Sequence, residues 1–218
     1  MSRPLVSLKL ATSLDGKIAL SNGQSKWITS EDARAEGRIL RAEHDGICIG
    51  ANTAELDNPT LTARIDGEKD PVRIIFDSRL RLSTGSILAQ TAGEVPVFVF
   101  CDQALKTGSN ILKSLGVEVF AVPRRVDGLD LNYCMDVLSK SGVNSLLVEG
   151  GGTLAASFLR NGLVDRIHWF RAPIILGGDG RNCIGNMSFQ SLDIVPRFER
   201  KSFETIGTDT YEILERSN

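Results

Sequence analysis

Apolar runs of strand length alternate along this chain with longer mixed segments that have the length of helices. The strand-like runs cover residues 5–11, 45–50, 73–77, 96–100, 117–121, 145–148 and 164–172. The helical segments cover residues 29–43, 51–56, 103–115, 129–140 and 153–161, the first opened by Thr29 and Asp32 in the manner of a capping box. This alternation predicts an α/β fold with a mostly parallel sheet flanked by helices.

The last segment departs from the alternation. Residues 198–214 alternate in polarity around Gly207-Thr208-Asp209, which predicts an antiparallel hairpin and makes the sheet mixed. No low-complexity linker and no internal repeat interrupts the chain. We therefore expect one domain over residues 1–218.

Composition narrows the class of protein. The 218 residues are 42% apolar with a formal net charge of −2, values typical of a globular chain and not of a disordered one. The mildly acidic balance argues against binding to nucleic acid or a membrane surface. The N-terminus has no apolar signal segment, and the longest apolar run, 95–101, is too short to cross a bilayer. We expect a cytoplasmic protein.

Potential metal ligands and nucleophiles are few. Four scattered cysteines lack the CxxC spacing and are interpreted as buried thiols in a reducing compartment. Two histidines, His44 and His168, lie in no telling motif and are interpreted as structural. The sequence thus predicts neither a zinc site of the usual kind nor a metal requirement.

The strongest local signal is a glycine turn between a strand and a helix, Ser145-Leu-Leu-Val-Glu-Gly-Gly-Gly-Thr153. Glycines allow close approach of a ligand, and the N–H groups at the following helix N-terminus attract phosphate. The alternative is a tight turn without a ligand. Glu149 lies at the carboxyl end of the strand, where α/β sheets bind ligands.

Other candidates have two interpretations each. Trp27 precedes a helix and is either a hydrophobic staple or a cover for a planar ring. Arg41 caps a helix end or, together with Arg64, clamps a phosphate. Asp77-Ser78-Arg79 follows a strand, where an acid reads a ribose 2′-hydroxyl and Ser with Arg suits a 2′-phosphate.

Taken in order, these motifs resemble one known family. The series LKLATSLDGKIA, SKWIT, LRAEHDGICIGANTAELDNPTLTAR, RIIFDSRLRL, LLVEGGGTLAASFL and FRAPIILGGDG resembles the reductase domain of bacterial bifunctional riboflavin-biosynthesis deaminase/reductases, over roughly residues 4 to 180. The resemblance implies a dihydrofolate-reductase-like fold and a homodimer. It also implies NADPH-dependent reduction of the ribosyl group of 5-amino-6-(5-phosphoribosylamino)uracil to ribityl.

The resemblance also implies roles for particular residues. Substrate contacts fall on Ser25, Arg41, Leu61, Arg64 and Glu149. NADPH contacts fall on Ala11, Trp27, Thr53, Asp57, Ser78, Gly151, Gly152, Thr153, Leu154, Ala155, Ala156 and Ser157. Glu149 and Lys9 are the candidates for the catalytic groups.

Two questions about the substrate stay open at this stage. The zinc-deaminase signature H-x-E…PCxxC is absent from the sequence, so we expect a reductase alone. The pyrimidine then arrives either deaminated or as its diamino-pyrimidinone precursor. The alternatives are a reductase of the same fold acting on another pterin or pyrimidine, and a non-catalytic NADPH-binding module. Arg41 and Arg64 favour a phosphorylated small-molecule substrate, and the set of substrate-side residues argues against the binding module.

Overall fold

The computed structural model describes residues 3–217, except for the side chains of residues 106–108, and divides the chain into two compact units. Unit 1 comprises Met1–Leu5 and Arg38–Gly150, and unit 2 comprises Val6–Gly37 and Gly151–Asn218. Each unit therefore draws on two separate stretches of the chain.

Unit 1 is a parallel sheet covered by helices. Its strands, in the order in which they pair, are β9 (Ser145–Val148), β3 (Gly46–Gly50), β4 (Val72–Phe76), β5 (Val97–Asp102) and β6 (Glu118–Val122). The remaining elements are α2 (Ala51–Asp57), α3 (Ile87–Gln90), the 3₁₀ segment η1 (Gln103–Ser109), α4 (Asn110–Ser114), β7 (Arg124–Arg125), β8 (Gly128–Leu129) and α5 (Leu131–Lys140). The alternation of strands and helices predicted from the sequence is confirmed here.

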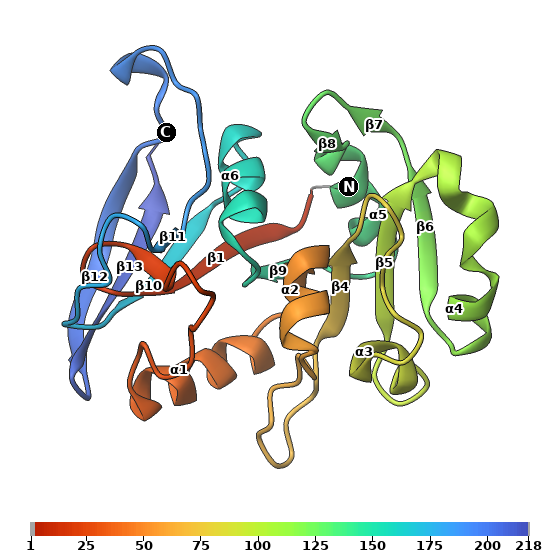
Figure 1. The fold of residues 1–218 in the computed structure, drawn as a ribbon, viewed down its shortest axis with the longest axis horizontal. Coiled ribbons are helices and arrows are strands. Elements are labelled where there is room, and N and C mark those ends of the chain that lie inside the picture. Colours follow the sequence, from red (N-terminus) through yellow and green to blue (C-terminus); the bar gives the residue numbers. More distant parts are fainter. Residues whose placement is uncertain (1–2, 218) are drawn as a thin grey trace. The chain divides into compact units, whose positions relative to one another are not determined.

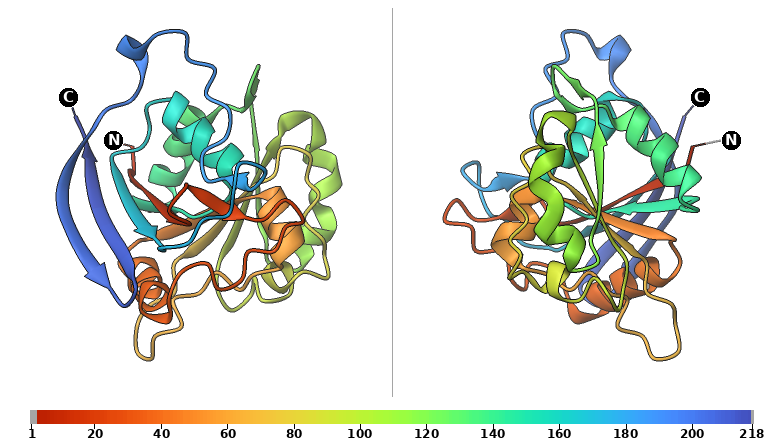
Figure 2. Two further views of the ribbon diagram at one scale, coloured as in Figure 1. Left: turned by 60° about the vertical axis from the view of Figure 1, so that its left-hand side comes forward. Right: turned by 90° about the vertical axis from the view of Figure 1, so that its right-hand side faces the viewer.

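The strand order decides which face of this sheet each helix covers. From β3 to β6 each strand is added on the same side of its predecessor, whereas the chain returns across the sheet from β6 to β9. Because parallel crossovers are right-handed, the helices of the forward steps and the helix of the return step cover opposite faces. Figure 1 shows β4, β5 and β6 side by side, and the right-hand view of Figure 2 shows α4 and α5 on opposite sides of these strands.

The central strands of unit 1, β9, β3, β4 and β5, are buried on both faces. One face carries a row of stacked rings, with centroids 5.4 Å apart for Phe76 and Phe100 and 5.3 Å apart for Phe100 and Phe120. These residues are direct partners in the registers of β4, β5 and β6, so the rings stack from strand to strand. The other face contributes Ile47, Ile49, Ile75 and other apolar residues to a core cluster.

Unit 2 contains the predicted hairpin. Its strands β12 (Phe198–Ile206) and β13 (Asp209–Arg216) are antiparallel, β13 is antiparallel to β10 (Arg166–Arg171), and β10 is parallel to β1 (Leu5–Thr12). Figure 2 shows the hairpin in blue in its left-hand view. The other elements are β2 (Lys17–Ala19), α6 (Gly152–Arg160), β11 (Arg181–Asn182) and η2 (Leu192–Ile194). Helix α1 (Glu31–Ala42) has its residues divided between the two units.

The N-terminus of α1 corrects one detail of the sequence analysis. The hydroxyl of Ser30, and not that of Thr29, accepts a hydrogen bond from the backbone N–H of Ala33. The N–H of Ser30 donates to Asp209 Oδ2 at 2.7 Å, so the reciprocal bond of the capping box comes from the hairpin and not from Asp32. A cap completed from a distant residue leaves no local signal in the sequence.

Several short elements were not predicted. The segment 103–115 is one predicted helix but forms a 3₁₀ stretch followed by the short α4. The loop between β4 and β5 contains the short α3, and the two- and three-residue strands β2, β7, β8 and β11 are too short to show a periodicity.

The cysteines and histidines are held within the fold. All four cysteines are free thiols, and their burial is confirmed. His168 is buried with its Nδ1 2.6 Å from the Tyr211 hydroxyl, and His44 Nδ1 lies 2.6 Å from the Leu40 carbonyl oxygen. In the part of the chain that the structure describes, no helix has the length and apolar character needed to cross a membrane.

Candidate functional site

Arg41 and Glu149, both predicted to contact the substrate, bind each other. Arg41 lies in the last turn of α1, and Glu149 follows the last residue of β9. The guanidinium donates from Nε to Oε1 at 2.7 Å and from Nη2 to Oε2 at 2.8 Å. The two side chains are only 20% and 9% exposed. The two parallel hydrogen bonds fix the orientation of both side chains relative to each other.

Burial and the charge of Glu149 act in opposite directions on the pKa of Arg41. Burial alone disfavours the charged guanidinium, but the hydrogen bond and the charge of Glu149 outweigh it and raise the pKa of Arg41. Arg41 Nη1 also donates to the carbonyl oxygen of Thr62 at 3.1 Å. Three of the five guanidinium N–H groups are thereby used within unit 1.

The loop from Asn58 to Arg64 carries the next two predicted substrate residues. Leu61 and Arg64 both have a φ of +55°, a conformation that costs a non-glycine residue about 1–3 kcal/mol. Two contacts maintain this strained conformation. The Leu61 side chain is 3% exposed and packs in the core, and the N–H of Ala63 donates to Asp70 Oδ1 at 2.8 Å. Arg64 is exposed and donates from Nη2 to Thr60 Oγ1 at 2.6 Å. Since Leu61 is buried, it offers a ligand its backbone and not its side chain.

In the segment after β4, the structure distinguishes side chains whose roles the sequence could not tell apart. Asp77 is buried, and its Oδ2 accepts from the N–H groups of Arg81 and Leu82, so it shapes the turn and does not present an acid to a ribose. Arg81 binds Glu55 and Asn52. Arg79 is exposed and has no ion-pair or hydrogen-bond partner among residues 3–217. The half-buried Ser78 and the exposed Arg79 are thus the two residues of this segment whose side chains have no competing partner among the described residues.

Two further predicted cofactor residues of unit 1 lie on α2. Thr53 is half-buried in the first turn of this helix, and Asp57 is exposed at its last residue. Both residues therefore lie on α2, whereas the Arg41–Glu149 pair joins α1 to the end of β9.

Each glycine of the turn after β9 has a structural reason. A Cβ on Gly150 would lie 2.4 Å from Ile49 Cα, and one on Gly152 would lie 2.5 Å from the carbonyl oxygen of Asn182. Gly151, with φ 67° and ψ 146°, has a backbone conformation open almost only to glycine. The tight-turn interpretation therefore accounts for all three residues without a ligand.

The same turn nevertheless leaves a helix end suited to an anion. Gly151 is the N-cap of α6 and no side chain caps this end within the described residues, so its first N–H groups keep their affinity for phosphate. Thr153 is exposed here, whereas Leu154, Ala155 and Ala156 are buried. Ser157 donates from Oγ to the Thr153 carbonyl oxygen. Contacts with a cofactor must come from the backbone at 151–153 and the polar side chains, since the three apolar side chains face the core.

Trp27 is exposed and held by a cation. Its φ is 69°, its exposed fraction is 74%, and the guanidinium of Arg34 lies 4.2 Å from its ring centroid. Because the ring is so exposed, it does not act as a hydrophobic staple, and the interpretation as a cover for a planar ring is favoured. Ser25 lies in the same exposed loop. Sequence reasoning missed Arg34, since a cation–π contact seven residues away has no motif of its own.

Lys9 and Ala11 lie on β1 in unit 2. Lys9 lies inside the strand, three residues before its end at Thr12. Its ammonium lies 5.9 Å from the ring centroid of Phe170, and a Cβ on Gly37 would be 3.7 Å from its Nζ. Ala11 is half-buried.

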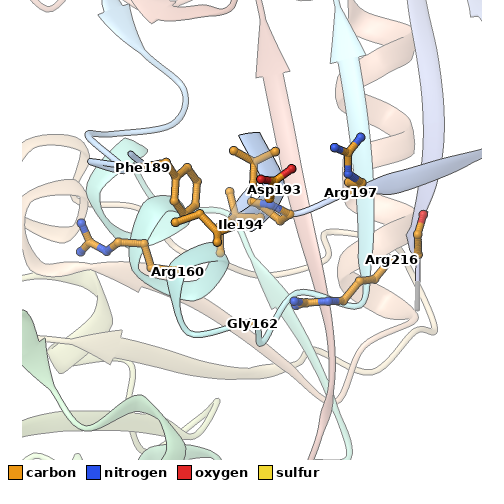
Figure 3. Close-up of a pocket in the computed structure, with 11 residues that line it drawn as sticks. Arg160, Gly162, Phe189, Asp193, Ile194, Arg197 and Arg216 are labelled. Carbon is orange, nitrogen blue, oxygen red and sulfur yellow. The ribbon is translucent and has the colours of Figure 1, made fainter. Parts of the chain in front are cut away.

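A surface pocket of about 270 Å³ lies elsewhere in unit 2. Figure 3 shows it at the C-terminal end of α6, lined among others by Arg160, Phe189, Ile194 and Arg197. No predicted site residue lines it, so this pocket is not part of the candidate site. Among the described residues no cluster of His, Cys, Asp and Glu could hold a metal ion.

Comparison with known proteins adds to this geometry. The RibD C-terminal domain family matches residues 4–211. The riboflavin biosynthesis protein RibD of Bacillus amyloliquefaciens is 38% identical over 214 residues, which are 94% of this chain and 56% of that protein. The Aquifex aeolicus 2,5-diamino-6-ribosylamino-4(3H)-pyrimidinone 5′-phosphate reductase is 32% identical over 88% of this chain and 87% of its own length.

A solved structure agrees with these sequence matches. RibD of Acinetobacter baumannii superposes with a TM-score of 0.83 at 28% identity, covering 99% of this chain and 58% of that protein. The mixed, mostly parallel sheet with its C-terminal hairpin is a dihydrofolate-reductase-like fold, as the sequence predicted. The chain belongs to the RibD C-terminal domain family. It spans about half the length of the RibD proteins that it matches.

The contacts at Gly150 predict a stability effect. Gly150→Ala should lower the free energy of unfolding by about 1–3 kcal/mol, because the new methyl group meets backbone atoms of β3 that cannot rotate away. Gly93→Ala is the matched control, since a Cβ there meets nothing within 4 Å, and it should stay within about 0.5 kcal/mol of wild type. Urea unfolding followed by circular dichroism measures both. Equal stabilities would contradict the close packing of the turn.

The Arg41–Glu149 pair predicts a second effect. Glu149→Gln should cost about 1.5–3 kcal/mol of stability, because it removes a charge-assisted bond from a largely buried guanidinium. Glu55→Gln, which weakens the exposed pair with Arg81, should cost less than about 1 kcal/mol. A double-mutant cycle with Arg41→Met measures the coupling. A coupling energy near zero would show that the pair does not stabilise unit 1.

Proposed function

We propose that this chain catalyses the NADPH-dependent reduction of the ribosyl group of 5-amino-6-(5-phosphoribosylamino)uracil, or of its diamino-pyrimidinone precursor, to ribityl in riboflavin biosynthesis. The observation that carries the proposal concerns the loop from Thr60 to Arg64. Both predicted phosphate-binding arginines donate hydrogen bonds to residues of this loop, Arg41 to Thr62 and Arg64 to Thr60. The reductase from Aquifex aeolicus, which this chain matches over most of its length, supports this substrate class.

The substrate phosphate is assigned to the two arginines. Arg64 is exposed on a strained, anchored loop, and a guanidinium there suits a phosphate because it donates two parallel hydrogen bonds. Arg41 adds a permanent positive charge bonded to the same loop. Glu149, with both oxygens already accepting from Arg41, acts as a fixed acceptor that orients the substrate. Ser25 and the backbone of Leu61 complete the proposed substrate contacts.

The residues present fit NADPH. The uncapped N-terminus of α6 suits a diphosphate, the exposed Trp27 suits a planar ring, and Ser78 with Arg79 suits a 2′-phosphate. When bound, the cofactor supplies the hydride that reduces C1′ of the ring-opened sugar. Remaining cofactor contacts are assigned to Ala11, Thr53, Asp57 and the polar groups of Gly151, Gly152, Thr153 and Ser157.

The protein's own task is binding, orientation and proton handling. Opening of the ribosylamine gives an imine at C1′, and its nitrogen must stay protonated while the carbon is reduced. Lys9, whose ammonium lies beside the Phe170 ring, is the candidate cation that faces the substrate. Glu149, fixed by Arg41, is the candidate group that orients the substrate. We further propose that the protein works in the cytoplasm as a homodimer, with a small-molecule substrate and without nucleic acid.

The test of this proposal is NADPH oxidation with three substrates compared side by side: the phosphoribosylamino-uracil, its diamino-pyrimidinone precursor and dihydrofolate. Turnover of either phosphorylated pyrimidine supports the proposal, and the faster one identifies the order of deamination and reduction. Turnover of dihydrofolate alone would indicate another pterin reductase. NADPH binding without turnover of any of the three would indicate a binding module.

Substitutions of Arg64 and of Arg41 should differ in the substrates for which they lower kcat/KM. Arg64→Ala should lower kcat/KM for the phosphorylated substrate about tenfold to a hundredfold and hardly affect its dephosphorylated analogue, because only the phosphate contact is removed. Arg64→Lys should recover part of the loss, since it keeps the charge without the planar fork. Arg41→Ala should lower both activities, because it also releases Glu149. An equal loss on both substrates in Arg64→Ala would contradict the phosphate assignment.

Cofactor preference should depend on Arg79 and not on Arg81. Arg79→Ala should reduce the ratio of kcat/KM for NADPH to that for NADH by about tenfold or more, because it removes the unpaired cation beside Ser78. Arg81→Ala is the control, since its guanidinium is already bonded to Glu55 and Asn52. Steady-state kinetics with both cofactors measure the ratio. The assignment would fail if only Arg81→Ala changed it.

A further inference from the structure

We infer that Thr60 is a positioning residue for substrate binding: its hydroxyl fixes the orientation of Arg64, and the buried Arg73 fixes Thr60 in turn. This inference rests on the proposed role of Arg64 in holding the substrate phosphate. Neither Thr60 nor Arg73 is among the residues that the family resemblance assigns to substrate or cofactor.

The first step is the contact between Thr60 and Arg64. Arg64 Nη2 donates to Thr60 Oγ1 at 2.6 Å, across a loop in which Leu61 and Arg64 both have positive φ. This is the one hydrogen bond of the Arg64 side chain within residues 3–217. An exposed arginine loses much rotamer freedom when it binds an anion, so a bond that already holds the side chain lowers this entropic cost of binding.

The second step is the attachment of Thr60 to the protein interior. Arg73, on β4, is 1% exposed, and its Nη1 donates to the carbonyl oxygen of Thr60 at 3.3 Å. The same guanidinium donates to Thr91 Oγ1 at 2.7 Å, to the Thr91 carbonyl oxygen at 2.9 Å and to the Val95 carbonyl oxygen. A buried cation with these partners cannot move without breaking several bonds at once. Thr60 is thereby tied to the sheet and to the end of α3.

The third step concerns the rest of the loop. Asn58 Oδ1 accepts from the N–H of Ile87 at 2.9 Å, and the N–H of Ala63 donates to Asp70, so the loop is fixed on both sides of Thr60. The Thr62 carbonyl oxygen, two residues on, accepts from Arg41. The loop therefore transmits the position of the buried Arg73 to both arginines, through Thr60 to Arg64 and through the backbone at Thr62 to Arg41.

The test replaces the Thr60 hydroxyl without changing the shape of the side chain. Thr60→Val should raise KM for the phosphorylated substrate about threefold to tenfold, leave kcat within twofold and leave NADPH affinity unchanged, because the preorganisation of Arg64 is lost. The change also removes the long contact of 3.4 Å from the Thr62 hydroxyl, so Thr62→Val, which removes that contact alone, should match wild type. Thr60→Ser restores the hydroxyl and should restore KM. Thr84→Val, the same change at an exposed residue of the same unit, should match wild type. If Thr60→Val does not fold, Thr60→Ala serves in its place.

A double-mutant cycle separates positioning from a general loss of structure. In an Arg64→Ala background, Thr60→Val should have no further effect on KM, because there is no guanidinium left to orient. An equal effect in both backgrounds, or no effect of Thr60→Val in the wild-type background, overturns the inference and leaves the proposed function standing. A wild-type KM for the phosphorylated substrate in Arg64→Ala overturns both the phosphate assignment and the inference that rests on it.

Discussion

The bidentate ion pair between Arg41 and Glu149 is the constraint on which the candidate substrate residues depend. It joins the last turn of α1 to the end of β9, and through the Thr62 carbonyl oxygen it reaches the loop that carries Leu61 and Arg64. Sequence reasoning offered Arg41 as a helix cap or as a phosphate ligand. The structure adds a partner that the sequence did not show, Glu149, and a guanidinium with five N–H groups can bind this carboxylate and the Thr62 carbonyl and still face a ligand.

The glycine turn after β9 satisfies both interpretations that the sequence allowed, a tight turn and a phosphate site. Packing against β3 and against the segment around Asn182 demands small residues at Gly150 and Gly152, and the backbone at Gly151 demands a positive φ. These requirements would exist without any ligand. The same geometry leaves the N-terminus of α6 without a side-chain cap. A tight turn and a phosphate site are therefore not competing interpretations here, because the first provides the conditions for the second.

The sequence predicted the pattern of the fold because strands buried on both faces are mainly apolar, and β3, β4, β5 and β9 are, with the buried Arg73 of β4 as an exception. It could not predict which polar side chains bind one another. Asp77 and Arg79 are two residues apart, yet one is buried under the following turn and the other is exposed, and only the path of the chain decides this. The role of Thr60 was missed for the same reason, since its partners Arg64 and Arg73 become visible only when the loop is folded.

The Asp209 cap on α1 has a consequence for how the chain reaches this state during synthesis. Ser30 and Asp209 are separated by 179 positions, so the backbone N–H of Ser30 lacks this partner until Asp209 has left the ribosome. All segments of unit 1 are available once Gly150 has emerged, whereas Val6–Gly37 must wait for Gly151–Asn218 to complete unit 2. A nascent chain therefore carries β1 and the first turn of α1 without their partners until the hairpin has been made, and a truncation before Asp209 removes a hydrogen bond from the start of α1.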